Sequence, residues 1–224
     1  MTYLEVFKDL EKDKATNLRS CDFLFSLFLK AYPKMGLNWS DNWHEWTNKI
    51  LTFFAELGKL YEYHVYLNPE YGVLDLNNEP TGEYLVDLCW SFEDENERAF
   101  WLDLALESEL SGRKVDSIKD DFWKLTDVKA YTKVGIFTPF LRDKDRVLEE
   151  ITSCVAHHGI RVPTERYLVI LILNHGKTEI ESKRIEIAGY EISYLGDLRE
   201  IDSKRFSAKL RKTKAKTKTK SKQT

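Results

Sequence analysis

The sequence predicts an α/β fold in which helices flank a mixed sheet. In four segments the apolar residues recur every three or four positions, which is the period of an amphipathic helix. Between these segments the apolar residues alternate with polar ones or run continuously, which is typical of strands. A chain of 224 residues, 42% of them hydrophobic, is long enough to bury the core that such an arrangement needs.

Two helices are expected near the N-terminus. Apolar residues recur at helical spacing from Leu18 to Tyr32, and Pro33 and Gly36 should end this helix. A longer pattern with a strongly aromatic stripe runs from Trp43 to Leu60. We expect the second helix to pack this stripe into the core.

Three strands should follow the second helix. The segment "LYEYHVYL" (60–67) alternates with period two. The segments "EYLVDLCWSF" (83–92) and "AFWLDLALESEL" (99–110) are joined by the polar "EDENER". Because this connection is short, we expect the two strands to form an antiparallel hairpin.

The second half of the sequence predicts a helix over 115–128, a strand over 131–140 and a helix over 143–158. The continuous apolar run 166–174 is typical of a strand buried on both faces. The segment 177–196 alternates and is expected to form a peripheral hairpin. The order after the first helix is therefore helix, three strands, helix, strand, helix, strand.

The chain is expected to divide into an N-terminal helical extension (1–40), an α/β domain with a C-terminal hairpin (41–203) and a disordered basic tail (204–224). The tail holds ten Lys and Arg and no acid, so the remainder holds 24 basic and 37 acidic residues, a formal charge of −13. Such a tail attracts nucleic acid or an anionic surface. The alternative is a solubilising tail that folds back on the acidic domain.

Several classes of protein find no support in the sequence. No apolar run approaches the length of a membrane span, and the first residues lack the pattern of a secretory signal, so we expect a cytoplasmic protein without membrane contact. The three cysteines are widely spaced and should be buried. The sequence contains no paired C-x-x-C, no G-x-S-x-G and no glycine loop that would hold a phosphate.

Acidic residues gather in the predicted hairpin. Alternation in 99–110 places Asp103, Glu107 and Glu109 on one face, and pairing with 83–92 brings Asp87 close to Glu107. Neighbouring carboxylates are costly to desolvate unless a cation neutralises them, and Mg²⁺ prefers oxygen ligands of this kind. The alternative is a solvated face whose acids pair with Lys and Arg elsewhere.

With its strand order and acid spacing, the segment from about 41 to 175 resembles the PD-(D/E)XK nuclease superfamily. The resemblance implies a restriction-endonuclease-like mixed sheet flanked by helices, with the core order helix, three strands, helix, strand. It also implies hydrolysis of phosphodiester bonds in nucleic acid, DNA in preference to RNA, with Mg²⁺ or Mn²⁺ held by Asp87 and Glu107. A homodimer is compatible with this family.

One departure from the family pattern concerns the lysine of its motif. Glu109 stands where that lysine is expected, so the motif is E-x-E and Glu109 becomes a third acid of the site. The resemblance implies that Lys124, on the following helix, supplies the missing lysine, and that Glu56 adds an acid from the first core helix. The alternative is a non-catalytic member of the fold that binds nucleic acid or a protein partner.

Overall fold

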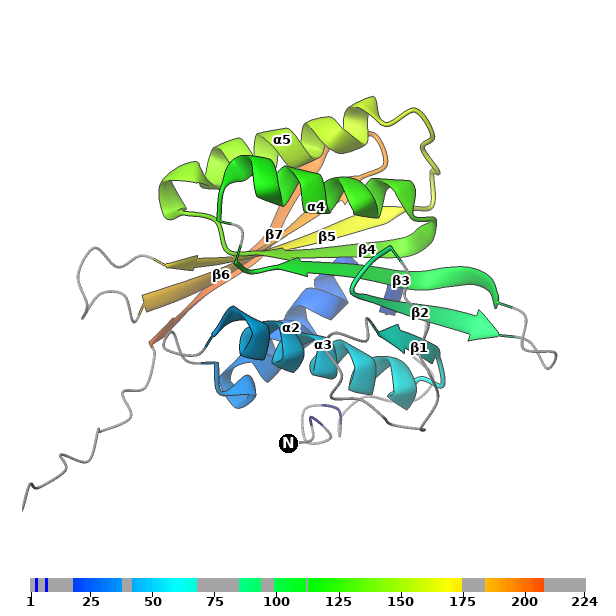
Figure 1. Ribbon diagram of the computed structural model, residues 1–224, viewed down its shortest axis with the longest axis horizontal. Helices are drawn as coiled ribbons and strands as arrows, with labels where there is room; N and C mark the ends of the chain where they lie inside the picture. Colours follow the sequence, from blue (N-terminus) through cyan, green and yellow to red (C-terminus); the bar gives the residue numbers. More distant parts are fainter. Residues whose placement is uncertain are drawn as a thin grey trace, which may run out of the picture.

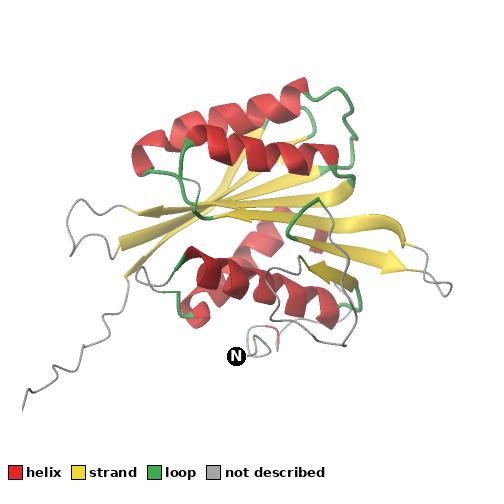
Figure 2. Ribbon diagram, viewed as in Figure 1, coloured by secondary structure: helices red, strands yellow, loops and turns green. Residues whose placement is uncertain are grey.

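The computed structural model of the protein describes residues 3, 7, 18–37, 42–67, 85–93, 99–111, 113–174 and 184–207. Within these ranges the chain forms one seven-stranded sheet between two layers of helices (Figures 1 and 2). The helices are α2 (Cys21–Met35), α3 (Trp43–Leu60), α4 (Val115–Asp127) and α5 (Lys144–His157), with the 3₁₀ helix η3 (Leu141–Asp143). The strands are β1 (His64–Leu67), β2 (Leu88–Glu93), β3 (Ala99–Glu109), β4 (Ala130–Phe137), β5 (Arg166–Asn174), β6 (Arg184–Ser193) and β7 (Leu198–Ser207). The prediction of a mixed α/β fold is confirmed.

The strands of the sheet follow the order of the chain from β1 to β7. Neighbours pair in parallel at β3–β4 and β4–β5 and antiparallel at the other four junctions. Parallel neighbours need a crossover, which α4 and α5 provide. The predicted antiparallel hairpin of β2 and β3 is present. Among the described helices, none combines the length and the apolar content needed to cross a membrane.

Each face of the sheet has its own core. The α2/α3 face buries aromatic side chains such as Phe28 and Phe54, and the indole Nε1 of Trp90 on β2 donates a hydrogen bond to the Phe54 carbonyl at 3.1 Å. The α4/α5 face buries Phe122 and Ile151. Strand β5 supplies side chains alternately to both cores, which confirms its prediction as a strand buried on both faces.

Two predicted boundaries differ in the structure. Pro33 lies inside α2, which continues to Met35 and ends at Gly36 with a φ of 62°. A proline this close to the C-terminal end costs only one backbone hydrogen bond, whereas a left-handed φ favours glycine. The hairpin predicted over 177–196 lies later in the chain, because the described part of that segment holds only β6 and its partner β7 extends to Ser207, four residues into the predicted basic tail. The rest of that tail, 208–224, lies outside the described residues.

A bulge interrupts β3 near its start. Trp90 pairs with Leu104 whereas the next residue, Ser91, pairs with Leu102, so Asp103 is the extra residue of the bulged strand. The bulge reverses the alternation of side chains, because Leu104 packs in the α2/α3 core and Leu102 packs against the other.

Because of the bulge, the prediction that Asp103 lies on the same face as Glu107 is wrong. Its Oδ1 accepts a hydrogen bond at 2.7 Å from Nη2 of Arg19, which lies just before α2. Burial and a hydrogen bond to Asp103 raise the pKa of Tyr63, whose ring stacks on Trp90 in the α2/α3 core. Asp103 therefore does not share a face with Glu107, because simple alternation does not hold across the extra residue.

Candidate functional site

Asp87 and Glu107 meet where β2 begins beside the end of β3. The backbone N–H of Asp87 donates to Oε2 of Glu107 at 3.2 Å, and the backbone N–H of Ser108 donates to Oδ2 of Asp87 at 2.8 Å. The next residue pair, Leu88 and Leu106, is in register across the two strands. We call Asp87 and Glu107 the acid pair. Adjacent strands thus hold both carboxylates in place through the main chain.

A lysine from α4 reaches the acid pair. Nζ of Lys124 lies 2.8 Å from Oε1 of Glu107 and 2.8 Å from Oδ1 of Asp121, one turn earlier on the same helix. Helix α4 directs Lys124 there because Phe122 and Leu125 anchor it in the α4/α5 core. The structure thus brings Lys124 to the acid pair, the position in which the family resemblance would place the missing lysine.

The acid pair is short of positive charge. Burial is the main cause that raises the pKa of Asp87 to about 6, and Asp121 and Glu109 add to it while Lys124 opposes it. Burial also raises the pKa of Glu107 to about 7, and the charge of Asp87 contributes because Asp87 ionises at lower pH. Burial lowers the pKa of Lys124, but its bonds to Asp121 and Glu107 outweigh burial and raise it. One ammonium group thus faces three nearby carboxyl groups.

The two remaining predicted site residues differ in their positions. Glu109 follows on β3 and lies at the margin of the acid pair, where its Oε1 accepts a hydrogen bond of 2.6 Å from Oγ of Ser111. Glu56 is not brought to the acid pair. It lies on α3, which packs on the other face of the sheet, and its Oε2 accepts a hydrogen bond of 2.7 Å from the backbone N–H of Tyr3. The prediction of an added acid from this helix is therefore wrong for Glu56.

The donors at this site suit a hard divalent cation with few protein ligands. Within the described part of the chain, no group of three or more His, Cys, Asp or Glu side chains is arranged to hold a metal ion. The acid pair offers two carboxylates that repel each other, and Mg²⁺ is commonly held by one or two carboxylates together with water and phosphate oxygens. The residues present thus fit Mg²⁺ or Mn²⁺ better than a four-ligand zinc site.

The structure contains a buried ion pair that the sequence did not predict. Nζ of Lys133 on β4 lies 2.8 Å from Oε2 of Glu165 and 3.1 Å from the hydroxyl oxygen of Tyr167. The Lys133 side chain is fully buried, and burial lowers its pKa although Glu165 opposes this. Lysine in the otherwise apolar "YTKVGIF" was the available signal, but its partner 32 residues later cannot be found from local spacing.

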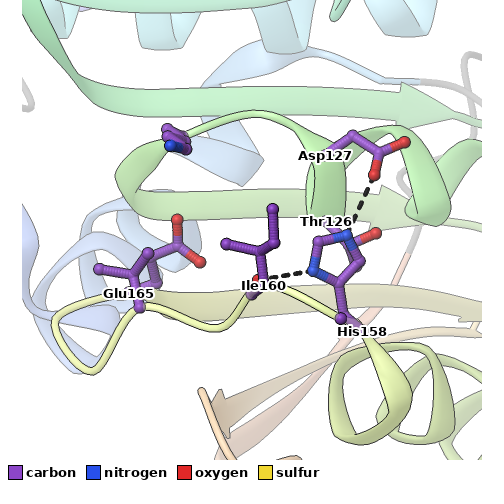
Figure 3. A pocket seen from close by; sticks show the side chains of 8 residues that line it. Thr126, Asp127, His158, Ile160 and Glu165 are labelled. Carbon is purple, nitrogen blue, oxygen red and sulfur yellow. Dashed lines mark hydrogen bonds and ion pairs between the residues drawn. The ribbon is translucent and has the colours of Figure 1, made fainter.

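Glu165 also borders a pocket of about 180 Å³ at the C-terminal end of α4 (Figure 3). In this pocket Nε2 of His158 lies 3.0 Å from Oδ1 of Asp127, and Nδ1 lies 2.6 Å from the carbonyl oxygen of Ile160. Both ring nitrogens of His158 therefore lie within hydrogen-bond distance of an oxygen atom, which holds the ring in place at the side of the pocket.

Comparison of the chain with protein-family models, curated proteins and solved structures finds no match.

Proposed function

We propose that this protein is a divalent-metal-dependent nuclease of the PD-(D/E)XK type, with the acid pair as the metal site. The observation that carries the proposal is the contact of Lys124 with Glu107 beside Asp87. A carboxylate just before β2, one on β3 and the lysine of the following helix thereby converge, with Lys124 in place of the motif lysine that Glu109 replaces. The succession α3, β1, β2, β3, α4, β4 also supports a restriction-endonuclease-like core.

In this proposal the protein's own groups bind and orient a phosphodiester. Asp87 and Glu107 would hold Mg²⁺ or Mn²⁺, which supplies a Lewis acid for a phosphate oxygen and lowers the pKa of a bound water. Lys124, a point charge on a flexible stem, would contact the phosphate or orient the attacking water. Glu109, in the place of the family lysine, would be a third acid at the margin of the site.

A cleavage assay with purified protein tests this proposal. Single- and double-stranded DNA and RNA should be incubated with Mg²⁺, with Mn²⁺ and with EDTA, and we expect cleavage of DNA that EDTA abolishes. Asp87→Ala should abolish cleavage, and Lys124→Ala should reduce it at least tenfold. Glu149→Gln on the exposed side of α5 is the matched control and should cut normally. Cleavage that persists in Asp87→Ala would refute the assigned site.

A second candidate function is a non-catalytic member of the same fold that binds nucleic acid or a protein. It is favoured by the two carboxylates that already hold Lys124, because this ion pair neutralises part of the charge that would attract a metal. Titration calorimetry with Mn²⁺ separates the two candidates. Binding that Asp87→Ala removes supports the nuclease, and absence of binding near pH 7.5 supports the non-catalytic protein.

A further inference from the structure

A groove borders the N-terminal ends of the central strands β4 and β5, at the opposite end of these strands from the acid pair. It consists of the pocket shown in Figure 3 and a neighbouring hollow of about 190 Å³, and the two share Lys129, Val162 and Glu165. The second hollow is lined mainly by apolar groups, among them Trp101 and Tyr131. We call the two hollows together the edge groove.

Aromatic and cationic groups meet at the mouth of the edge groove. Trp101 is 45% exposed although it is a tryptophan within a long strand, and it meets the Tyr131 ring edge to face with centroids 6.2 Å apart. The guanidinium carbon of Arg19 lies 4.1 Å from the centroid of the Tyr131 ring. Exposed aromatic rings beside cations are the usual means by which proteins stack unpaired nucleobases.

The inner wall of the groove presents a fixed hydrogen-bond acceptor. Glu165 lines both hollows and is only 5% exposed. Lys133 binds its Oε2 from the core side at 2.8 Å, which orients the carboxylate. Figure 3 shows this carboxylate and the His158 ring on either side of Ile160. A carboxylate accepts hydrogen bonds only, so it selects a ligand that offers N–H groups.

Helix α4 connects the edge groove with the acid pair, since Asp127 near its end lines the groove and Lys124 contacts Glu107. Asp121, Lys124 and Asp127 are spaced by three residues and lie on one side of this helix. Lys124 contacts Glu107 and Asp127 lines the groove, with a rise of about 4.5 Å between them. Along β3, Trp101 and Glu107 are six residues apart, or about 20 Å, which is the length of about six stacked nucleotides.

From these contacts we propose that the edge groove binds an unpaired nucleobase with an exocyclic amino group, stacked on Trp101 and bonded to Glu165. This inference rests on the proposed function, since the base would belong to the strand whose phosphodiester lies at the acid pair. Cytosine, adenine and guanine offer such an amine. Thymine and uracil do not, and two carbonyl oxygens flank their single ring N–H and would repel the carboxylate. The substrate class is therefore a single-stranded or locally opened nucleic acid.

Binding without cleavage tests the proposal. In EDTA, the anisotropy of labelled 12-nucleotide single strands of cytosine, adenine or thymine should be measured with full-length protein carrying Asp87→Ala. We expect cytosine and adenine strands to bind about tenfold more tightly than thymine strands. Adding Trp101→Ala should weaken binding about tenfold. Leu195→Ala, at a 49% exposed residue of the β6–β7 turn, is the control and should bind unchanged.

The outcomes separate this inference from the proposed function. Equal binding by the Trp101→Ala and Leu195→Ala proteins would overturn the inference, and so would absence of binding to any single strand, even if the unmutated protein cuts nucleic acid. Tryptophan-dependent binding without cleavage in any metal would refute the nuclease and leave the base site standing. Glu165→Gln should equalise binding of cytosine and thymine strands, and a preference retained in this folded variant would exclude Glu165 as the acceptor.

Discussion

Replacing Glu107 by glutamine should stabilise the protein at pH 8. Glutamine keeps the shape of the side chain and one oxygen for Lys124. It gives up the second oxygen, which accepts the long 3.2 Å bond from the Asp87 N–H, but it removes a charge from a residue that is only 5% exposed. The pKa of Glu107 is about 7 against an ordinary value of 4.5. A difference of this size corresponds to about 3 kcal/mol between the two protonation states. At pH 8 Glu107 is ionised in the folded protein, so folding includes the free-energy cost of burying its charge. The glutamine variant has no such charge to bury.

The sign of the effect fixes its pH dependence. A carboxyl group whose pKa is raised by folding favours the folded state below its unfolded pKa, and this advantage is lost as the pH rises through the folded value. The stability of the unmutated protein should therefore fall relative to Glu107→Gln between about pH 4.5 and pH 7. For a chain of this length, about 3 kcal/mol corresponds to about 6–12 °C in melting temperature.

Thermal unfolding in EDTA, followed by circular dichroism from pH 4 to pH 8, measures this difference. Glu149→Gln, on the exposed side of α5, controls for loss of a negative charge and should melt with the unmutated protein at every pH. A Glu107→Gln variant that melts at or below the unmutated protein at pH 8 would refute the reasoning, because the carboxylate would then be well compensated in the fold.

Two further predictions concern the cores. Gly189→Ala should lower the free energy of unfolding by about 1–3 kcal/mol in urea titration, because its Cβ would lie 2.6 Å from the Phe25 ring, whereas Gly159→Ala meets no atom within 4 Å and should change little. Lys133→Met should cost about 3–5 kcal/mol at pH 7 because it leaves Glu165 buried without its partner, and adding Glu165→Gln should recover most of the loss. No recovery in the double variant would show that lost packing, not the unpaired charge, caused the instability.

Periodicity was sufficient to predict most elements of this fold. Helix α3 was identified from the helical period of its aromatic stripe, and strand β5 from a continuous apolar run, which the structure buries on both faces. The same reasoning brought Asp87 to Glu107, because the bulge of β3 lies before the segment of regular pairing that joins them. Lys124 was named from the family resemblance, which allows the lysine to come from the helix that follows β3.

Local patterns failed where a distant contact decides the structure. The bulge at Asp103 has no signature in the strand itself, and its carboxylate turns to Arg19, 84 residues earlier. The ion pair of Lys133 and Glu165 forms only when β4 and β5 align. Glu56 was assigned from a family resemblance, and nothing in the helical pattern indicates that its carboxylate meets the backbone of Tyr3.

Because Lys124 lies on a helix, substitutions outside the acid pair can change its distance from Glu107 during evolution. A lysine on β3 would be fixed by the ladder of the sheet, but Lys124 is positioned by the side chains beneath α4. Gly135 leaves space for the Phe137 ring, which would lie 2.6 Å from a Cβ at this position and which meets the Phe122 ring of α4 with centroids 6.3 Å apart. A shift of α4 by a single residue is a displacement of about 1.5 Å, about three times the range of roughly 0.5 Å over which N–H···O distances vary. Substitutions in this buried layer would therefore alter the charge at Glu107 while every residue of the acid pair stays the same.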